Sequence, residues 1–68
     1  MYHKYEKLRD KKGLTDMEVS RETGIPATTL YDWKRRSDGN PFAALSLANM
    51  AAIAKTLEVE LEYFTSDN

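Results

Sequence analysis

A stretch near the middle of the chain carries the side chains best suited to binding chemistry. Thr28, Tyr31 and Arg35 follow one another at helical spacing, and Leu30 and Trp33 lie three residues apart. On a helix, this spacing puts the apolar pair on a buried stripe and the polar residues on another face. Trp33 shares the face of Leu30, so we expect it in the core and not stacked on a base. Short polar groups contact base edges and cations contact phosphates, so the stretch predicts a helix that binds nucleic acid.

The predicted helix covers residues 27–36 and ends in three consecutive cations, Lys34, Arg35 and Arg36. These cations either contact phosphates or complement the negative end of the helix dipole. We favour phosphate contact for Arg35 above its neighbours, because successive residues on a helix point about 100° apart. Thr29 points partly toward the preceding helix.

A second short helix is expected to position the first. Thr15 suits an N-cap and Glu18 follows three residues later, which is the pattern of a capping box. The helix is predicted to reach Thr23 and to stop at Gly24, and Pro26 is tolerated at the start of the next helix. Two short helices joined in this way predict a helix-turn-helix.

Flanking helices are expected to complete the core. A first helix over residues 2–12 turns Tyr5 and Leu8 inward and ends at Gly13, which tolerates a left-handed backbone. Residues 37–41, Ser-Asp-Gly-Asn-Pro, predict a loop.

The last third of the chain predicts a central core helix from its N-cap Ser46 to Leu57, with Ile53 at the edge of its apolar stripe. Residues 59–64 fit either a short strand or a helical turn, and the helical context favours the turn. Phe42 either folds back on the core or lies exposed. The predicted stripe consists of Leu47, Met50, Ala51, Ala54 and Leu57.

Charge is unevenly distributed along the chain. Residues 1–36 carry nine Lys or Arg and six Asp or Glu, a net charge of +3. Residues 37–68 carry one Lys or Arg and five Asp or Glu, a net charge of −4. Such a dipolar molecule can orient on a polyanion, although scattered solvated charge explains the same numbers.

Composition excludes several classes of protein. The 68 residues suffice for one domain, cysteine is absent, and His3 is the only histidine. We therefore expect no disulfide, no metal site and no cofactor. We also expect no enzyme, because a nucleophile with its base and a Gly-rich phosphate loop are both missing. No apolar run approaches the roughly 20 residues of a membrane span, so a cytoplasmic protein is expected.

Three segments together resemble the Cro/C1-type (XRE-like, phage lambda repressor-like) helix-turn-helix family. The resemblance covers about residues 5–64 and implies an all-α, compact five-helix lambda repressor-like DNA-binding domain over residues 1–64. Its helix-turn-helix would be formed by the second and third helices, and residues 65–68 would be a disordered tail. The segments are 12–15 (Lys-Gly-Leu-Thr), 23–33 (Thr-Gly-Ile-Pro-Ala-Thr-Thr-Leu-Tyr-Asp-Trp), and 45–47 with 53–59 and 61–64.

The resemblance also implies which residues contact DNA, with the third helix in the major groove. Two residues depart from the family pattern. Asp16 stands where a glutamine often binds phosphate, and Ala27 stands where a long amide is common. Base contacts are expected from Ala27, Thr28, Thr29 and Tyr31. Backbone contacts are expected from Thr15, Asp16, Lys34, Arg35, Arg36, Ser46 and Asn49.

Two functions are consistent with these features. The first is a sequence-specific regulator of transcription that binds double-stranded DNA, repressor-like and of phage, prophage or bacterial type. It is expected to act as a homodimer, with Tyr63 and Phe64 as the candidate dimer surface. The second is a helix-turn-helix-derived protein–protein interaction module, antirepressor-like or antitoxin-like. The net charge of −1 and Asp16 favour this second function. A continuous positive surface around the third helix would favour DNA.

Overall fold

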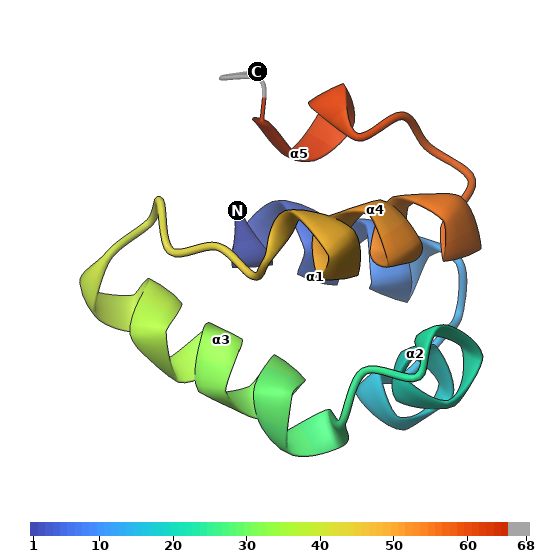
Figure 1. The fold of residues 1–68 in the computed structure, drawn as a ribbon, viewed down its shortest axis with the longest axis horizontal. Helices are drawn as coiled ribbons and strands as arrows, with labels where there is room; N and C mark the ends of the chain where they lie inside the picture. Colours follow the sequence, from blue (N-terminus) through green and yellow to red (C-terminus); the bar gives the residue numbers. More distant parts are fainter. Residues whose placement is uncertain (66–68) are drawn as a thin grey trace.

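The computed structural model describes residues 1–65 and contains five helices in that range, with no strand (Figure 1). The predicted all-α class is therefore confirmed, and within residues 59–64 a helical turn forms from Glu62 onward, with no strand. In Figure 1, α1 and α4 cross the middle of the molecule, with α3 below them and α5 above them. The helices are α1 (Tyr2–Lys11), α2 (Asp16–Thr23), α3 (Ala27–Gly39), α4 (Leu47–Thr56) and α5 (Glu62–Thr65).

The starts of α2 and α4 and the end of α2 form where their local signals predict them. The Thr15 hydroxyl accepts a hydrogen bond from the Glu18 backbone N–H at 3.2 Å, and the Glu18 carboxylate accepts one from the Thr15 N–H at 3.1 Å. This capping box starts α2, and Gly24 ends it with a left-handed φ of 80°. Ser46 caps α4 with a single bond, in which its hydroxyl accepts from the Asn49 backbone N–H at 3.2 Å.

An aromatic cluster from two helices forms the centre of the core. The Trp33 ring lies 5.2 Å from the Tyr2 ring and 5.3 Å from the Tyr5 ring, measured between centroids. All three side chains are almost completely buried, and so is Leu30. The prediction that Trp33 and Leu30 hold α3 to the core is confirmed. The burial of Tyr2 was not predicted.

The predicted loop at residues 37–41 is wrong for its first three residues, because α3 continues to Gly39. Ser37 lies four residues after Trp33, so it prolongs the buried stripe and is only 4% exposed. The helix ends at Asn40, whose φ of −148° and ψ of 103° are extended. Proline disfavours helical backbone at the residue before it, so Pro41 sets this boundary.

The buried face of α4 differs from the predicted stripe. Met50, Ile53 and Ala54 are buried, whereas Leu47 is 72% exposed and Ala51 is also exposed. Leu47 is the first residue of the helix, and its side chain lies beyond the edge of the core.

The aromatic side chains of the loop before α4 and of α5 differ in their exposure. Phe42 lies in the loop between α3 and α4 and is 76% exposed. Phe64 is 2% exposed, so its side chain packs into the core and is not available to the candidate dimer surface. Tyr63 beside it is 39% exposed, and the Lys4 ammonium lies 5.5 Å from its ring centroid. Helix α5 includes Thr65, the first residue of the predicted tail, and residues 66–68 lie outside the described part.

Within residues 1–65, no helix is both long enough and apolar enough to cross a lipid bilayer.

Candidate nucleic-acid interface

The outer face of α3 brings together three of the predicted contact residues. Thr28 is exposed, Tyr31 is 66% exposed, and the Arg35 side chain is 70% exposed. They occupy positions i, i+3 and i+7, which share one side of a helix. Ala27 and Thr29 are half-buried and flank this face. We call Thr28, Tyr31 and Arg35 the outer face of α3.

The turn between α2 and α3 is fixed by side-chain hydroxyls. Ser20 donates a hydrogen bond to the Ile25 carbonyl at 2.5 Å. Thr23 donates to the Val19 carbonyl at 2.7 Å and accepts from the Ile25 N–H at 3.2 Å. The bonds to the Ile25 carbonyl and N–H satisfy backbone groups of the turn and tie it to α2, so they help to set the angle at which α3 leaves α2.

The far end of α3 is anchored to the loop that follows it. The Trp33 indole N–H donates to the Ala43 carbonyl at 2.8 Å inside the core. Both terminal nitrogens of Arg36 lie 3.3 Å from the Ala44 carbonyl. The helix is therefore held at both ends, which leaves its outer face on a rigid support.

Two of the three cations of α3, Arg35 and Arg36, are paired within their own helix. Asp32 accepts a hydrogen bond from Arg35 at 2.8 Å through one carboxylate oxygen and from Arg36 at 2.9 Å through the other. These i,i+3 and i,i+4 spacings bring the side chains together on the helix surface. Hydrogen bonds from Arg35 first, and then from Arg36, hold the pKa of the Asp32 carboxyl below its ordinary value. Lys34 is exposed and makes no contact with Asp32.

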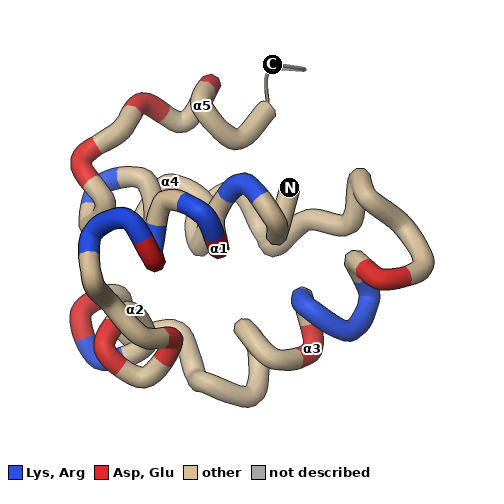
Figure 2. Tube along the Cα trace, turned by 180° about the vertical axis from the view of Figure 1, so that it is seen from behind, with Lys and Arg blue, Asp and Glu red and all other residues tan. Residues whose placement is uncertain are grey.

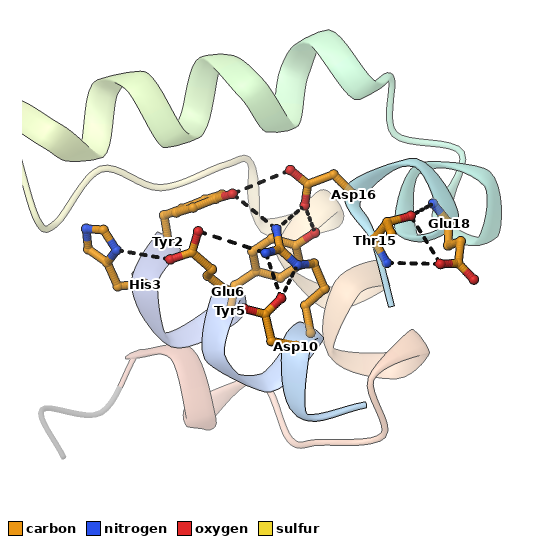
Figure 3. A network of polar contacts seen from close by, with 9 residues as sticks. Tyr2, His3, Tyr5, Glu6, Asp10, Thr15, Asp16 and Glu18 are labelled. Carbon is orange, nitrogen blue, oxygen red and sulfur yellow. Dashed lines mark hydrogen bonds and ion pairs between the residues drawn. The ribbon is translucent and has the colours of Figure 1, made fainter. Parts of the chain in front are cut away.

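Asp16, the first residue of α2, is held by α1 (Figure 3). Its carboxylate accepts hydrogen bonds from the Tyr5 hydroxyl at 2.6 Å and from the Arg9 guanidinium at 2.7 Å, and the Tyr2 hydroxyl lies at 3.4 Å. The Arg9 side chain is only 14% exposed, and Asp10 pairs with it from the solvent side at 2.8 Å. We call Tyr2, Tyr5, Arg9 and Asp16 the α1–α2 network.

Burial and charge shift the ionisation of this network. Desolvation, and then the hydrogen bond to Asp16, raise the pKa of the Tyr5 phenol. Desolvation and the Asp16 charge raise the pKa of Tyr2. Burial alone would lower the pKa of Arg9, but hydrogen bonds to Asp10 and Asp16 outweigh it and leave that pKa raised. The network therefore consists of a carboxylate, a guanidinium and two neutral phenols.

Sequence reasoning found Asp16 but not its partners on α1. Tyr2, Tyr5 and Arg9 lie at positions i, i+3 and i+7, so the spacing indicates that they share a face. That spacing could have identified the trio. It could not identify Asp16 as the group they bind, because this requires the relative placement of α1 and α2.

The remaining predicted backbone contacts lie at two helix N-termini. Thr15 is exposed, with its hydroxyl engaged in the capping box of α2. Ser46 is exposed and Asn49 is half-buried at the start of α4. The first N–H groups of a helix have no partner in that helix and carry partial positive charge, so such ends favour anions.

The basic charge of the N-terminal half lies mainly on α1. Residues 1–13 carry five Lys or Arg and two Asp or Glu, so 5 − 2 = +3. Residues 15–39, which include α2 and α3, carry four Lys or Arg and five Asp or Glu, so 4 − 5 = −1. Figure 2 shows acidic residues on α2 and on both sides of the cations of α3. The positive surface around α3 is therefore not continuous.

No group of three or more His, Asp or Glu side chains that could hold a metal ion occurs in the described part of the chain. Comparison with models of known protein families gives no match, and searches among curated proteins and solved structures also give no significant match. The resemblance to the Cro/C1-type family therefore stays a prediction.

Proposed function

We propose that the chain is a sequence-specific DNA-binding regulator of transcription, repressor-like, with a lambda repressor-like arrangement in which α2 and α3 form the helix-turn-helix. In this proposal α3 enters the major groove and Thr28 and Tyr31 contact base edges. The observation that carries it is the exposed outer face of α3 on a helix that is anchored at both ends. A rigid helix holds short polar groups in a fixed register, which direct contact with bases requires.

Arg35 and the N-terminus of α2 supply the phosphate contacts in this proposal. Arg35 follows Thr28 and Tyr31 on the outer face, and its side chain is 70% exposed. At α2, the Asp16 carboxylate is turned toward Arg9 and Tyr5, so the helix end retains its partial positive charge with less opposition from that side chain.

In-vitro selection of bound duplexes from a random pool tests the proposal. We expect an enriched sequence, and a two-fold symmetric one if the protein binds as a homodimer, because one module of this size gives weak specific binding. Recovery of no enriched sequence contradicts the proposal.

Gel-shift titrations on the selected duplex then test α3 itself. Thr28→Ala removes one polar group and should weaken binding about fivefold, with little effect on unrelated DNA. Arg35→Glu should weaken binding about tenfold or more on both kinds of DNA. Lys55→Glu makes the same charge change at an exposed position of α4 and is the matched control. Equal losses for Arg35→Glu and Lys55→Glu would show that α3 is not the contact helix.

A second candidate function is protein binding, and the charge distribution favours it. Asp32 pairs with two of the three cations of α3, and residues 15–39 are net negative. A protein partner with a basic surface would complement this region better than DNA does. If the in-vitro selection enriches no DNA sequence although the protein is folded, protein binding replaces DNA binding as the favoured function.

A further inference from the structure

We propose that Asp32 competes with DNA phosphates for Arg35 and thereby lowers the affinity of this protein for DNA of arbitrary sequence. The inference rests on the proposed DNA-binding function and adds an affinity-limiting residue that itself contacts neither base nor phosphate.

The geometry of Asp32 supports a competing role. Its two carboxylate oxygens are divided between the two arginines, one at 2.8 Å and one at 2.9 Å. Asp32 precedes both arginines on the helix, an order that favours acid–base pairing. Because the carboxylate already neutralises much of their charge, fewer counterions are released when these arginines meet a phosphate.

The two arginines differ in what else holds them. Arg36 contacts Asp32 through its Nε and the Ala44 carbonyl through its terminal nitrogens, so it bridges α3 to the following loop. Arg35 has Asp32 as its hydrogen-bond partner and is the more exposed of the two, 70% against 44%. Arg35 is therefore the cation that exchanges between carboxylate and phosphate.

The movement of Arg35 from Asp32 to a phosphate leaves no unpaired charge on α3. When Arg35 moves to a phosphate, Asp32 retains Arg36, so a neutral pair stays on α3. The lowered pKa of Asp32 agrees with a carboxylate that is ionised and paired in the free protein. Exposed pairs of this kind are weak, so their competition changes DNA affinity by a factor of about two to five.

Fluorescence anisotropy with a labelled duplex of arbitrary sequence tests the proposal. Asp32→Asn should bind this duplex about two- to fivefold more tightly than the unchanged protein. For Asp32→Asn, the slope of log affinity against log salt concentration should become steeper by up to about one unit, because one more cation becomes available to phosphate. Adding Arg35→Gln to Asp32→Asn should remove the gain.

Asp38→Asn is the matched control. Asp38 is an exposed carboxylate on the same helix that pairs with neither arginine, so the substitution makes the same change in net charge. An equal gain for Asp32→Asn and Asp38→Asn would overturn the proposal in favour of general charge. Weaker binding by Asp32→Asn would also overturn it, because Asp32 would then position Arg35 for DNA.

The selected duplex separates failure of this inference from failure of the proposed function. Binding of that duplex by the unchanged protein, with no gain for Asp32→Asn on arbitrary DNA, overturns the competing role alone. Absence of binding to any duplex by any variant overturns both. Circular dichroism of each variant confirms that the helices are retained.

Discussion

The α1–α2 network gives the sharpest test of how this small domain is held together. Arg9→Met keeps the aliphatic stem of the side chain but removes the guanidinium that pairs with Asp16 at 2.7 Å. The Asp16 carboxylate would keep only the two phenol hydroxyls as partners. Removing one member of a fully buried pair costs about 3 to 5 kcal/mol. Because Asp16 is 31% exposed and water partly solvates it, we expect about 2 to 3 kcal/mol.

This loss is large for a chain of this length. A domain of 68 residues has a total stability of about 3 to 10 kcal/mol, so the variant would lose between about a fifth and all of it. The unfolding temperature should fall by about 15 to 20 °C, since each kcal/mol shifts it by about 7 °C at this size. Urea unfolding followed by circular dichroism measures the free energy, and calorimetry measures the temperature.

The chain offers a matched control on the same guanidinium. Asp10→Asn removes a carboxylate that also pairs with Arg9, at 2.8 Å, but whose side chain is 63% exposed. We expect this variant to lose less than about 0.5 kcal/mol. The double variant Arg9→Met with Asp16→Asn should cost less than the sum of the single variants, because it leaves no unpaired carboxylate. Equal losses for Arg9→Met and Asp10→Asn would refute the reasoning.

Three further predictions concern the core and the turn. Tyr2 and Tyr5 hold their protons more tightly in the folded chain than at the ordinary pKa of 10.0, so stability is full below pH 10 and falls above it. Urea unfolding from about pH 9 to 11 should show the free energy of unfolding decreasing once the pH passes about 10, by up to about 1.4 kcal/mol per pH unit from Tyr5, and Tyr5→Phe should make this decrease shallower; an unchanged slope would contradict this. Gly24→Ala should cost about 1 to 2 kcal/mol in urea unfolding, purely from its φ of 80°, because an added Cβ meets no atom within 4 Å. Trp33→Phe leaves the Ala43 carbonyl without its donor and should cost about 2 to 4 kcal/mol by the same assay. A loss below about 1 kcal/mol would show that this bond does not hold the loop.

Features set by neighbouring residues were predicted from the sequence. The capping box at Thr15 and the left-handed Gly24 depend on groups within four residues of each other, and both form. The two faces of α3 follow from its 3.6-residue period, and Leu30 and Trp33 are buried as expected. Local spacing suffices in these cases, because the competing conformations lack the same hydrogen bonds or burial.

Features set by distant contacts were not predicted correctly. Ser37 has the composition of a loop residue, but α3 continues past it because its position repeats the buried stripe of Trp33. Leu47 is predicted to continue the buried stripe of α4, yet it is exposed. Whether it meets the core depends on where α4 lies relative to the other helices, and sequence spacing carries no information on that placement.

The pairing of charges explains why the candidate site could be predicted only in part. The predicted base-contacting residues of α3 required only helical spacing, and Thr28 and Tyr31 are exposed as that spacing demands. The availability of Arg35 depends in addition on the rotamers of Asp32, Arg35 and Arg36. Net charge does not report this, because Asp32 and Asp38 count equally in it although only Asp32 pairs with the arginines.

Asp16 bears most directly on the choice between DNA and protein as the partner. A free carboxylate at the start of α2 would repel a phosphate and would favour the protein-binding candidate. The carboxylate is instead shared by Arg9 and Tyr5 and lies at 31% exposure. Its charge is thus largely compensated from within the domain, which weakens the objection that Asp16 raises against DNA. Asp32 is a further objection, but its pairing with Arg35 is exposed, so under the proposed competition it would limit affinity without excluding contact with phosphate.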